Sequence, residues 1–149
     1  MRSMRTARTV GRKFTMAAAG LLGAAALLVT NTVAAQAADY TNITFKMYPG
    51  KQSTIIIYAD GHQAGRVNWV ADPFGGAPGE YLCAVDDRSD GYYVKGILTT
   101  GRTVSTNGKP SPGADCQGGN LPEDRGYGLK ACLENHYVRA CSINYYVHS

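Results

Sequence analysis

Short stretches of alternating residues, separated by turn residues, run along most of the chain and constrain its fold more than any other feature. In the first stretch, Ile43, Phe45 and Met47 alternate with more polar side chains, as in a strand with one buried face. No stretch after residue 38 has the apolar spacing of a helix. We predict eight strands, at residues 43–48, 54–59, 66–70, 81–85, 92–99, 102–106, 127–133 and 138–147, with a long loop at 107–122.

Strands of this length, with turn pairs such as Asp60-Gly61 between them, are typical of an all-β domain. The favoured fold is a small antiparallel two-sheet sandwich stapled by two disulfides, because such strands bury one face each against a second sheet. A small closed barrel is the alternative.

The first 37 residues differ in composition from the rest and predict a secretory signal peptide. A basic start precedes an apolar stretch from about Met16 to Val29, and Ala35-Gln36-Ala37 places small residues at the −3 and −1 positions of a cleavage site. This apolar stretch is shorter than the roughly 20 residues that span a bilayer, which favours cleavage over a membrane anchor. We expect residues 1–37 to be a signal peptide and residues 38–149 to form a single secreted domain.

Removal of residues 1–37 reverses the sign of the net charge. The whole chain carries +4, but five of its 15 basic residues and none of its 11 acidic residues lie in this segment. The remaining 10 basic and 11 acidic residues give −1. A domain so close to neutral has no net positive charge to attract nucleic acid or an anionic membrane, and we expect neither as a partner.

All four cysteines, Cys83, Cys116, Cys132 and Cys141, lie in the predicted domain, and an even number in a secreted chain implies two disulfides. Three pairings are possible, and local spacing favours Cys132–Cys141, which leaves Cys83–Cys116. A zinc site is disfavoured because there is no CxxC pair and the three histidines are far apart in the sequence. We expect no metal ligand and no cofactor.

The favoured pairing follows from a predicted hairpin. If Asn135 pairs with Val138 around a two-residue turn, residues 132 and 141 face each other across the strands, where a disulfide is within reach. Farther along the last strand, Ile143, Tyr145 and Val147 alternate as one inward face. Extending that face backwards would bury Arg139, so either a bulge near residue 141 or an exposed disulfide is needed.

Residues 86–91, with the sequence DDRSDG, resemble the start of a calcium loop but carry arginine at its third position and isoleucine at its twelfth. A hairpin turn with aspartate caps and a positive φ at Gly91 is favoured, with a weak calcium site at Asp86, Asp87 and Asp90 as the alternative.

Candidate catalytic residues are few. His62, His136 and His148 are the only neutral-pH bases, and neither GxSxG nor HExxH occurs. We name no catalytic residue and predict no enzymatic activity, although a small secreted hydrolase assembled from distant residues is an open alternative.

Aromatic residues are the more abundant candidates for function. All ten tyrosines follow residue 38, and tyrosine offers rigid apolar area with a polar tip at binding surfaces. The alternation predicts that Tyr93 and Tyr146 point outward. We predict contacts from these two, from Trp69 and from Tyr40, which precedes a strand that could add to a partner's sheet. The alternatives are that the tyrosines only cover sheet faces and that residues 43–48 pair within their own sandwich.

Residues 107–113, NGKPSPG, form a second candidate because a stiff exposed loop tied to Cys116 could block a protease. A proline directly after Lys109 is a poor fit to a trypsin-like cleavage position, so a plain connecting loop is favoured. An inhibitor of an extracellular hydrolase is therefore the alternative function.

Several short motifs from about residue 79 to the C-terminus carry a resemblance to known proteins. They are Leu82-Cys83-Ala84-Val85-Asp86, Asp90-Gly91-Tyr92, Gly101-Arg102-Thr103, Asn120-Leu121-Pro122-Glu123 and the Cys132/Cys141 pair. These motifs resemble those of small secreted actinobacterial disulfide-bonded β-proteins, mostly of unknown function. Some proteins of this kind are adaptors in umbrella toxin particles, where they link a lectin subunit to the toxin scaffold. The resemblance implies an adaptor role, and thus a secreted, extracellular binding module whose partner is another secreted protein.

The mass of the secreted protein tests the predicted processing. We expect a chain that begins at Ala38 and is about 4 Da lighter than its fully reduced form, since each of two disulfides removes two hydrogens. Intact-mass spectrometry with and without reduction measures both quantities. A membrane-retained chain or one with free thiols would contradict this prediction.

Overall fold

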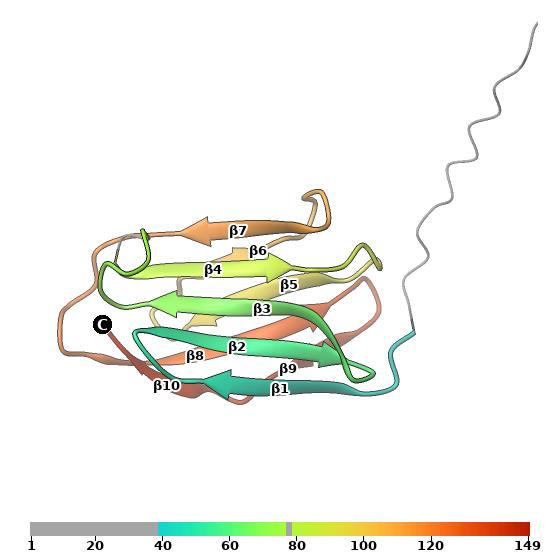
Figure 1. Cartoon of the computed structure of the whole chain (residues 1–149), viewed down its shortest axis with the longest axis horizontal. Coiled ribbons are helices and arrows are strands. Elements are labelled where there is room, and N and C mark those ends of the chain that lie inside the picture. The colour runs from blue at the N-terminus through green and yellow to red at the C-terminus, as the bar shows by residue number, and fades with distance from the viewer. Residues whose placement is uncertain (1–38, 77–78) are drawn as a thin grey trace, which may run out of the picture. The chain divides into compact units, whose positions relative to one another are not determined.

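The computed structural model describes residues 39–76 and 79–149, and the regular secondary structure in these ranges is entirely β-strand (Figure 1). The predicted signal peptide, residues 1–37, lies outside the described residues. In the ranges described, no helix is long and apolar enough to cross a membrane. The strands are β1 (Ile43–Tyr48), β2 (Gln52–Ala59), β3 (His62–Val70), β4 (Tyr81–Asp86), β5 (Tyr93–Leu98), β6 (Thr103–Ser105), β7 (Gly113–Gln117), β8 (Gly126–Glu134), β9 (Arg139–Cys141) and β10 (Tyr145–His148).

The strands form two antiparallel sheets, and the predicted two-sheet all-β fold with two disulfides is confirmed. One sheet has the order β1-β2-β3-β4-β7 and is called the β3 sheet here. The other, the β8 sheet, has the order β10-β8-β5-β6, and β9 also pairs with β8. In Figure 1 the β3 sheet faces the viewer and the β8 sheet lies behind it.

The core lies between the two sheets and is built from the inward side chains of each. In β2, β4 and β5, buried and half-buried residues alternate strictly, as the pleat requires. The sheets approach closely at Gly96, where a Cβ atom would lie 2.9 Å from Val67 Cγ1, so no larger residue fits there. The largest fully buried side chains include Ile55, Ile57, Val67, Trp69 and Leu82 from the β3 sheet, and Val94, Leu98, Val104, Leu129 and Leu133 from the β8 sheet.

The structure differs most from the predicted strands in three ways: β3 begins at His62 instead of residue 66, one strand lies in a predicted loop, and the last predicted strand is divided in two. β7 lies inside the predicted loop at 107–122, where β-branched residues are absent, and it forms because it pairs along β4 from Leu82 to Asp86. The predicted last strand is two strands, β9 and β10. Residues 142–144 lie opposite only two residues of β8, which shifts the register by one.

This register shift is a bulge, one of the two resolutions predicted for the last strand. Ile143 lies in the bulge and is 72% exposed, so the prediction that it points inward with Val147 is wrong. The shift leaves Arg139 on the solvent side, and Cys141 is exposed as well.

Both predicted disulfides are present, Cys83–Cys116 and Cys132–Cys141. Each joins residues that face each other directly on neighbouring strands of one sheet, β4 with β7 and β8 with β9. Each disulfide therefore fastens an outer strand to its own sheet, and neither links the two sheets.

The β8–β9 hairpin has the predicted two-residue turn. The backbone N–H of Asn135 donates to the carbonyl of Val138 at 2.9 Å. The side chain of Asn135 accepts from the N–H groups of Tyr137 and Val138, at 2.8 and 2.6 Å, which stabilises a turn that contains no glycine.

The two disulfides are expected to differ in their contribution to stability. Cys83 and Cys116 are 33 residues apart and Cys132 and Cys141 only nine, so the first bridge constrains the unfolded chain more. We expect a loss of about 3–4 kcal/mol in the free energy of unfolding for the double serine variant at Cys83 and Cys116, and about 2–3 kcal/mol for that at Cys132 and Cys141. Urea denaturation measures both, and the reverse order would contradict the prediction.

Candidate functional site

The four predicted contact residues do not form one surface. The Tyr40 ring packs on Tyr92 with 4.9 Å between ring centroids, and its hydroxyl donates to the Asp90 carboxylate. Burial and this hydrogen bond raise the pKa of Tyr40. Trp69 is 1% exposed and its Nε1 donates to the His148 carbonyl at 2.7 Å. The structure therefore places Trp69 in the core and uses Tyr40 to anchor the N-terminal segment, and the prediction that Trp69 is a contact residue does not hold.

Tyr93 and Tyr146 both lie on the outer face of the β8 sheet, as predicted, but toward opposite ends of β8. Tyr93 is opposite Glu134 and donates a hydrogen bond to its Oε2 at 3.0 Å, while burial and this bond raise the pKa of Tyr93. Tyr146 is opposite Gly128 and is 69% exposed. Its ring covers Gly126, where a Cβ atom would clash with it. The two tyrosines are not adjacent members of one patch.

The N-terminal strand pairs within its own sandwich. All six residues of β1 pair with β2, from Ile43 with Ala59 to Tyr48 with Thr54. Just before it, the backbone N–H of Asn42 donates to Asp60 Oδ1 at 2.8 Å, and such bonds lower the pKa of Asp60. Deletion of this segment would therefore disturb the domain as well as any partner contact.

The outer face of the β3 sheet carries apolar and aromatic side chains that the sequence analysis did not single out. Ile56 in β2 lies between Lys46 and Arg66 in the direct cross-strand pairing, and Arg66 is opposite Val85 in β4. Tyr58 follows Ile56 by two residues and so shares its side of the sheet. We name Tyr48, Ile56, Tyr58 and Val85 the aromatic face; all are half-buried except Tyr48, which is 39% exposed.

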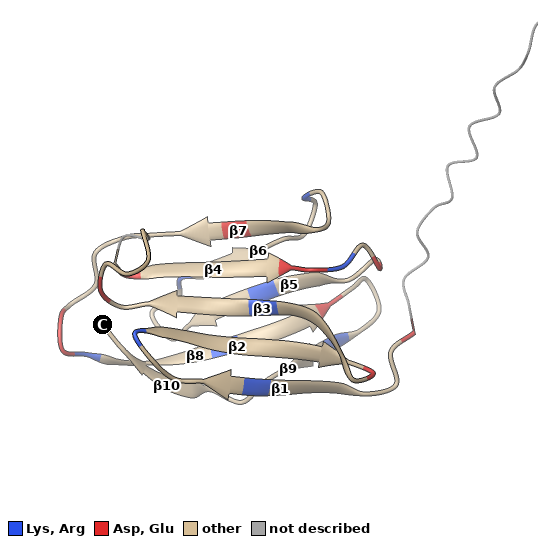
Figure 2. Cartoon of the chain, in the orientation of Figure 1, with Lys and Arg blue, Asp and Glu red and all other residues tan. Residues whose placement is uncertain are grey.

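Charge is sparse on this face. Figure 2 shows β1 to β4 mostly without charged residues, apart from basic positions on β1 and β3, with acidic residues mainly at strand ends and in loops. The β3 position is Arg66, which pairs with Asp87 at 2.7 Å, and the β1 position is Lys46, whose Nζ lies 5.0 Å from the Tyr48 ring centroid. The interaction with Lys46 lowers the pKa of Tyr48. Aromatic residues and arginine with few acidic groups are typical of the buried centre of protein interfaces.

The opposite outer face is more strongly charged, with Lys95 and Lys130 on β5 and β8 and the ion pair of Arg139 with Glu134 at 2.7 Å.

A signal for the aromatic face was present in the sequence. β2 contains the run Thr-Ile-Ile-Ile-Tyr, which is apolar on both faces of a strand. Because only one face can enter the core of a two-sheet sandwich, Ile56 must be displayed outside.

Residues 86–91 connect β4 to β5 and pass from one sheet to the other, so the predicted hairpin turn is wrong. The predicted caps are present: Asp86 accepts from the Arg88 N–H and Asp90 from the Tyr92 N–H, both at 3.0 Å, and Gly91 has a φ of 83°. Asp87 instead bonds with Arg66. The three carboxylates have separate partners, which disfavours the alternative of a shared calcium site.

Lys109, the candidate residue of an inhibitory loop, is already paired within the domain. Lys109 Nζ pairs with the Asp115 carboxylate. Within the described ranges, no histidine ring hydrogen-bonds to a carboxylate, and the one close trio of potential metal ligands, Cys132, Glu134 and Cys141, contains two disulfide-bonded cysteines.

Comparisons of the chain with protein-family models, with curated proteins and with solved structures return no match.

Asp86 provides a pH-dependent test of the β4–β5 connection. It is 3% exposed, and burial raises its pKa above the usual aspartate value. Ser111 Oγ lies 2.7 Å from Asp86 Oδ2 and also contacts the Arg88 carbonyl, so its single proton cannot serve both oxygens. A protonated Asp86 donates to Ser111, which leaves the serine proton for the carbonyl.

The direction in which stability changes with pH follows from the raised pKa of Asp86. The folded state holds the Asp86 proton more tightly than the unfolded chain, so stability declines as pH rises from the unfolded pKa, about 3.9, through the folded pKa. The amide introduced by Asp86→Asn donates to Ser111 at any pH. We expect this variant to gain stability relative to the parent between pH 3.5 and pH 7, measured by urea denaturation.

The control is Asp115→Asn. The pairing with Lys109 lowers the pKa of Asp115, so its contribution is present above the unfolded pKa and is lost as pH falls through the folded value. This variant is expected to lose stability relative to the parent over the same pH range. The same trend in both variants would contradict the opposite pKa shifts assigned to Asp86 and Asp115.

Proposed function

We propose that this protein is a secreted, non-enzymatic binding module that attaches to another secreted protein through the aromatic face. The observation that carries the proposal is the half-buried Ile56, which lies on the outer face of the β3 sheet with Tyr48 and Tyr58 beside it. Covering apolar side chains of this kind gains about 25 cal/mol for each Å² removed from water. Lys46 and Arg66, the cross-strand neighbours of Ile56, are the charges on this face that a bound partner would have to pair.

The chemistry of the domain supports an extracellular setting. Both disulfides are formed and no cysteine among the described residues is free, a pattern that persists in oxidising compartments. The resemblance to small secreted actinobacterial proteins supports an adaptor role, in which the module joins two parts of an extracellular complex.

The two alternative functions have less support. An inhibitory loop would need to present Lys109 to a protease, but its ammonium is engaged by Asp115. A hydrolase would need a base next to a carboxylate and a nucleophile, whereas His62, His136 and His148 lie in the β2–β3 hairpin, the β8–β9 turn and β10.

Two matched isoleucines test the proposed face. Ile56 in β2 and Ile97 in β5 are both half-buried and point outward from opposite sheets. A partner is first captured from culture supernatant with the purified protein and identified by mass spectrometry. We then expect Ile56→Asp to weaken the affinity for the purified partner by about 30-fold, or about 2 kcal/mol, because it places a charge at the centre of the contact.

Ile97→Asp is the control, since it introduces the same charge at an equivalent position of the other sheet. Its affinity for the partner should match that of the parent, and circular dichroism should report folded protein for both variants. Equal loss of binding in both, or loss in Ile97→Asp alone, contradicts the proposed face. Loss of binding in a Lys109→Ala variant, with the affinity of both isoleucine variants unchanged, would support the inhibitor function instead.

A further inference from the structure

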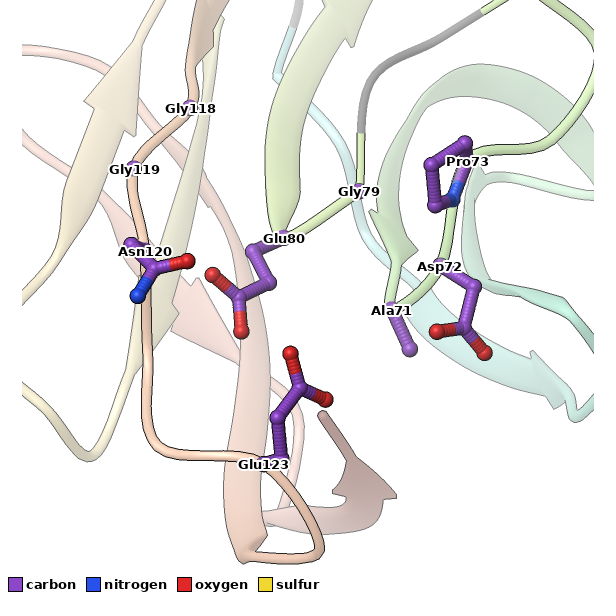
Figure 3. Close-up of a pocket in the computed structure, with 9 residues that line it drawn as sticks. All are labelled: Ala71, Asp72, Pro73, Gly79, Glu80, Gly118, Gly119, Asn120 and Glu123. Atoms are coloured by element: carbon purple, nitrogen blue, oxygen red, sulfur yellow. The ribbon is translucent and has the colours of Figure 1, made fainter.

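A cleft of about 320 Å³ lies between the β3–β4 connection and the segment that follows β7. Its walls carry three carboxylates, Asp72, Glu80 and Glu123, together with the amide of Asn120. Figure 3 shows the Glu80 and Glu123 carboxylates pointing toward each other, with Asn120 beside Glu80 and Asp72 on the other wall. The cleft thus gathers negative charge from segments distant in the sequence.

Glu80 is the unusual member of this group. It is only 6% exposed, and its Oε2 accepts a hydrogen bond from the backbone N–H of Leu121. Its Oε1 is buried and has no hydrogen-bond donor among the described residues. Burying a carboxylate oxygen without a partner is unfavourable, so a bound cation or a hydrogen-bond donor at this oxygen would stabilise the site.

The protein's own cations do not fill this role. The ion pairs of the described residues are elsewhere in the domain, at Arg66–Asp87, Lys109–Asp115 and Arg139–Glu134. Arg102 is nearby, but its Nη1 donates to the backbone carbonyl of Glu80, and its guanidinium carbon lies 5.8 Å from the Trp69 ring centroid. The carboxylates of Asp72, Glu80 and Glu123 form no ion pair with any described residue.

The backbone holds Glu80 rigidly in this position. Its N–H donates to the Ala71 carbonyl at 2.7 Å, and its φ of 53° turns the chain at the start of β4. On the other side of the cleft, Gly119 has a φ of 153°, a backbone conformation that residues with a side chain rarely adopt, so glycine is favoured there. The Ala71 carbonyl thus positions the backbone of Glu80, and the N–H of Leu121 positions its carboxylate.

We propose that this cleft binds a calcium ion, with the carboxylates of Glu80 and Glu123 as direct ligands. The available donors in the lining are oxygens, from carboxylates, the Asn120 amide and backbone carbonyls, which suits a hard cation rather than zinc or copper. Asp72, on the far wall, contributes charge and binds through water. Calcium accepts six to eight oxygens in irregular geometry, whereas magnesium requires a near-ideal octahedron that two facing carboxylates do not supply.

The chain's single tryptophan offers a readout for this site. Trp69 lies two residues before Ala71, a lining residue, and under the Arg102 guanidinium. Addition of CaCl₂ to the purified protein, with ionic strength held constant by NaCl, should change its tryptophan fluorescence in a saturable way. We expect a Kd of about 10⁻⁴–10⁻³ M, the range of extracellular calcium modules, and weaker binding of MgCl₂.

Two charge-matched variants locate the site. Glu123→Gln removes a direct ligand from an exposed position, so the domain should fold, and its Kd for calcium should rise at least about tenfold. Asp124→Asn removes the same charge from the next residue, which does not line the cleft, and should leave the Kd unchanged. Amide chemical-shift changes in the parent should centre on residues 79–80 and 118–123.

Three results would contradict the proposed calcium site. The absence of a saturable response up to about 10 mM calcium, ten times the upper end of that Kd range, overturns the proposal. An equal Kd for Glu123→Gln and Asp124→Asn overturns it as well, because the ion would then respond only to overall charge. Glu80→Gln serves as a further variant: a folded protein that binds calcium like the parent would exclude Glu80 as a ligand.

Discussion

Trp69 is buried on β3, the middle strand of the β3 sheet, and its contacts organise the packing of both sheets. Its indole fills the space between the sheets, and its Nε1 donates to the carbonyl of His148 in β10, so it ties the two sheets together. Because side chains alternate along a strand, an inward Trp69 and Val67 place Arg66 and Asn68 outside. The pairing of β3 with β2 and β4 then sets the outward positions of those strands, Ile56 and Val85 among them. The aromatic face is thus a consequence of the packing of the core.

The disulfides complement this core because they fasten outer strands that contribute none of its largest buried side chains. β7 is the last strand of the β3 sheet and β9 is only three residues long, and neither has a residue among the largest buried side chains. Cross-strand bridges from β4 and β8 hold these two strands in register. The structure therefore assigns apolar burial to the inner strands and covalent links to the outer ones.

Much of this architecture was predictable from the sequence. The alternation of residue types identified most strands, and the symmetric spacing of Cys132 and Cys141 about a turn predicted their pairing, which fixed the other disulfide. β7 was not predictable because its residues have low strand propensity, and its pairing with β4 is a long-range contact that a local pattern does not show. The bulge at residues 142–144 shifts the alternation by one residue, so a regular pattern wrongly placed Ile143 inside.

The functional residues were less predictable for a different physical reason. Composition identifies tyrosines, but exposure depends on which neighbours cover them: Asp90 and Tyr92 hold Tyr40, and Glu134 holds Tyr93. The acidic cleft joins Asp72, Glu80 and Glu123, and only the folded chain brings these segments together. A signal for the aromatic face did exist, in the three consecutive isoleucines of β2.

In the proposed binding mode, a partner covers the outer face of the β3 sheet and leaves the β8 sheet free. Hydroxyl-radical footprinting of the complex tests it directly, because tyrosine rings react readily wherever solvent reaches them. Binding should protect Tyr48 and Tyr58, while Tyr146, which is 69% exposed on the other sheet, should stay as reactive as in the free protein. Protection of Tyr146 with no change at Tyr48 and Tyr58 would contradict it.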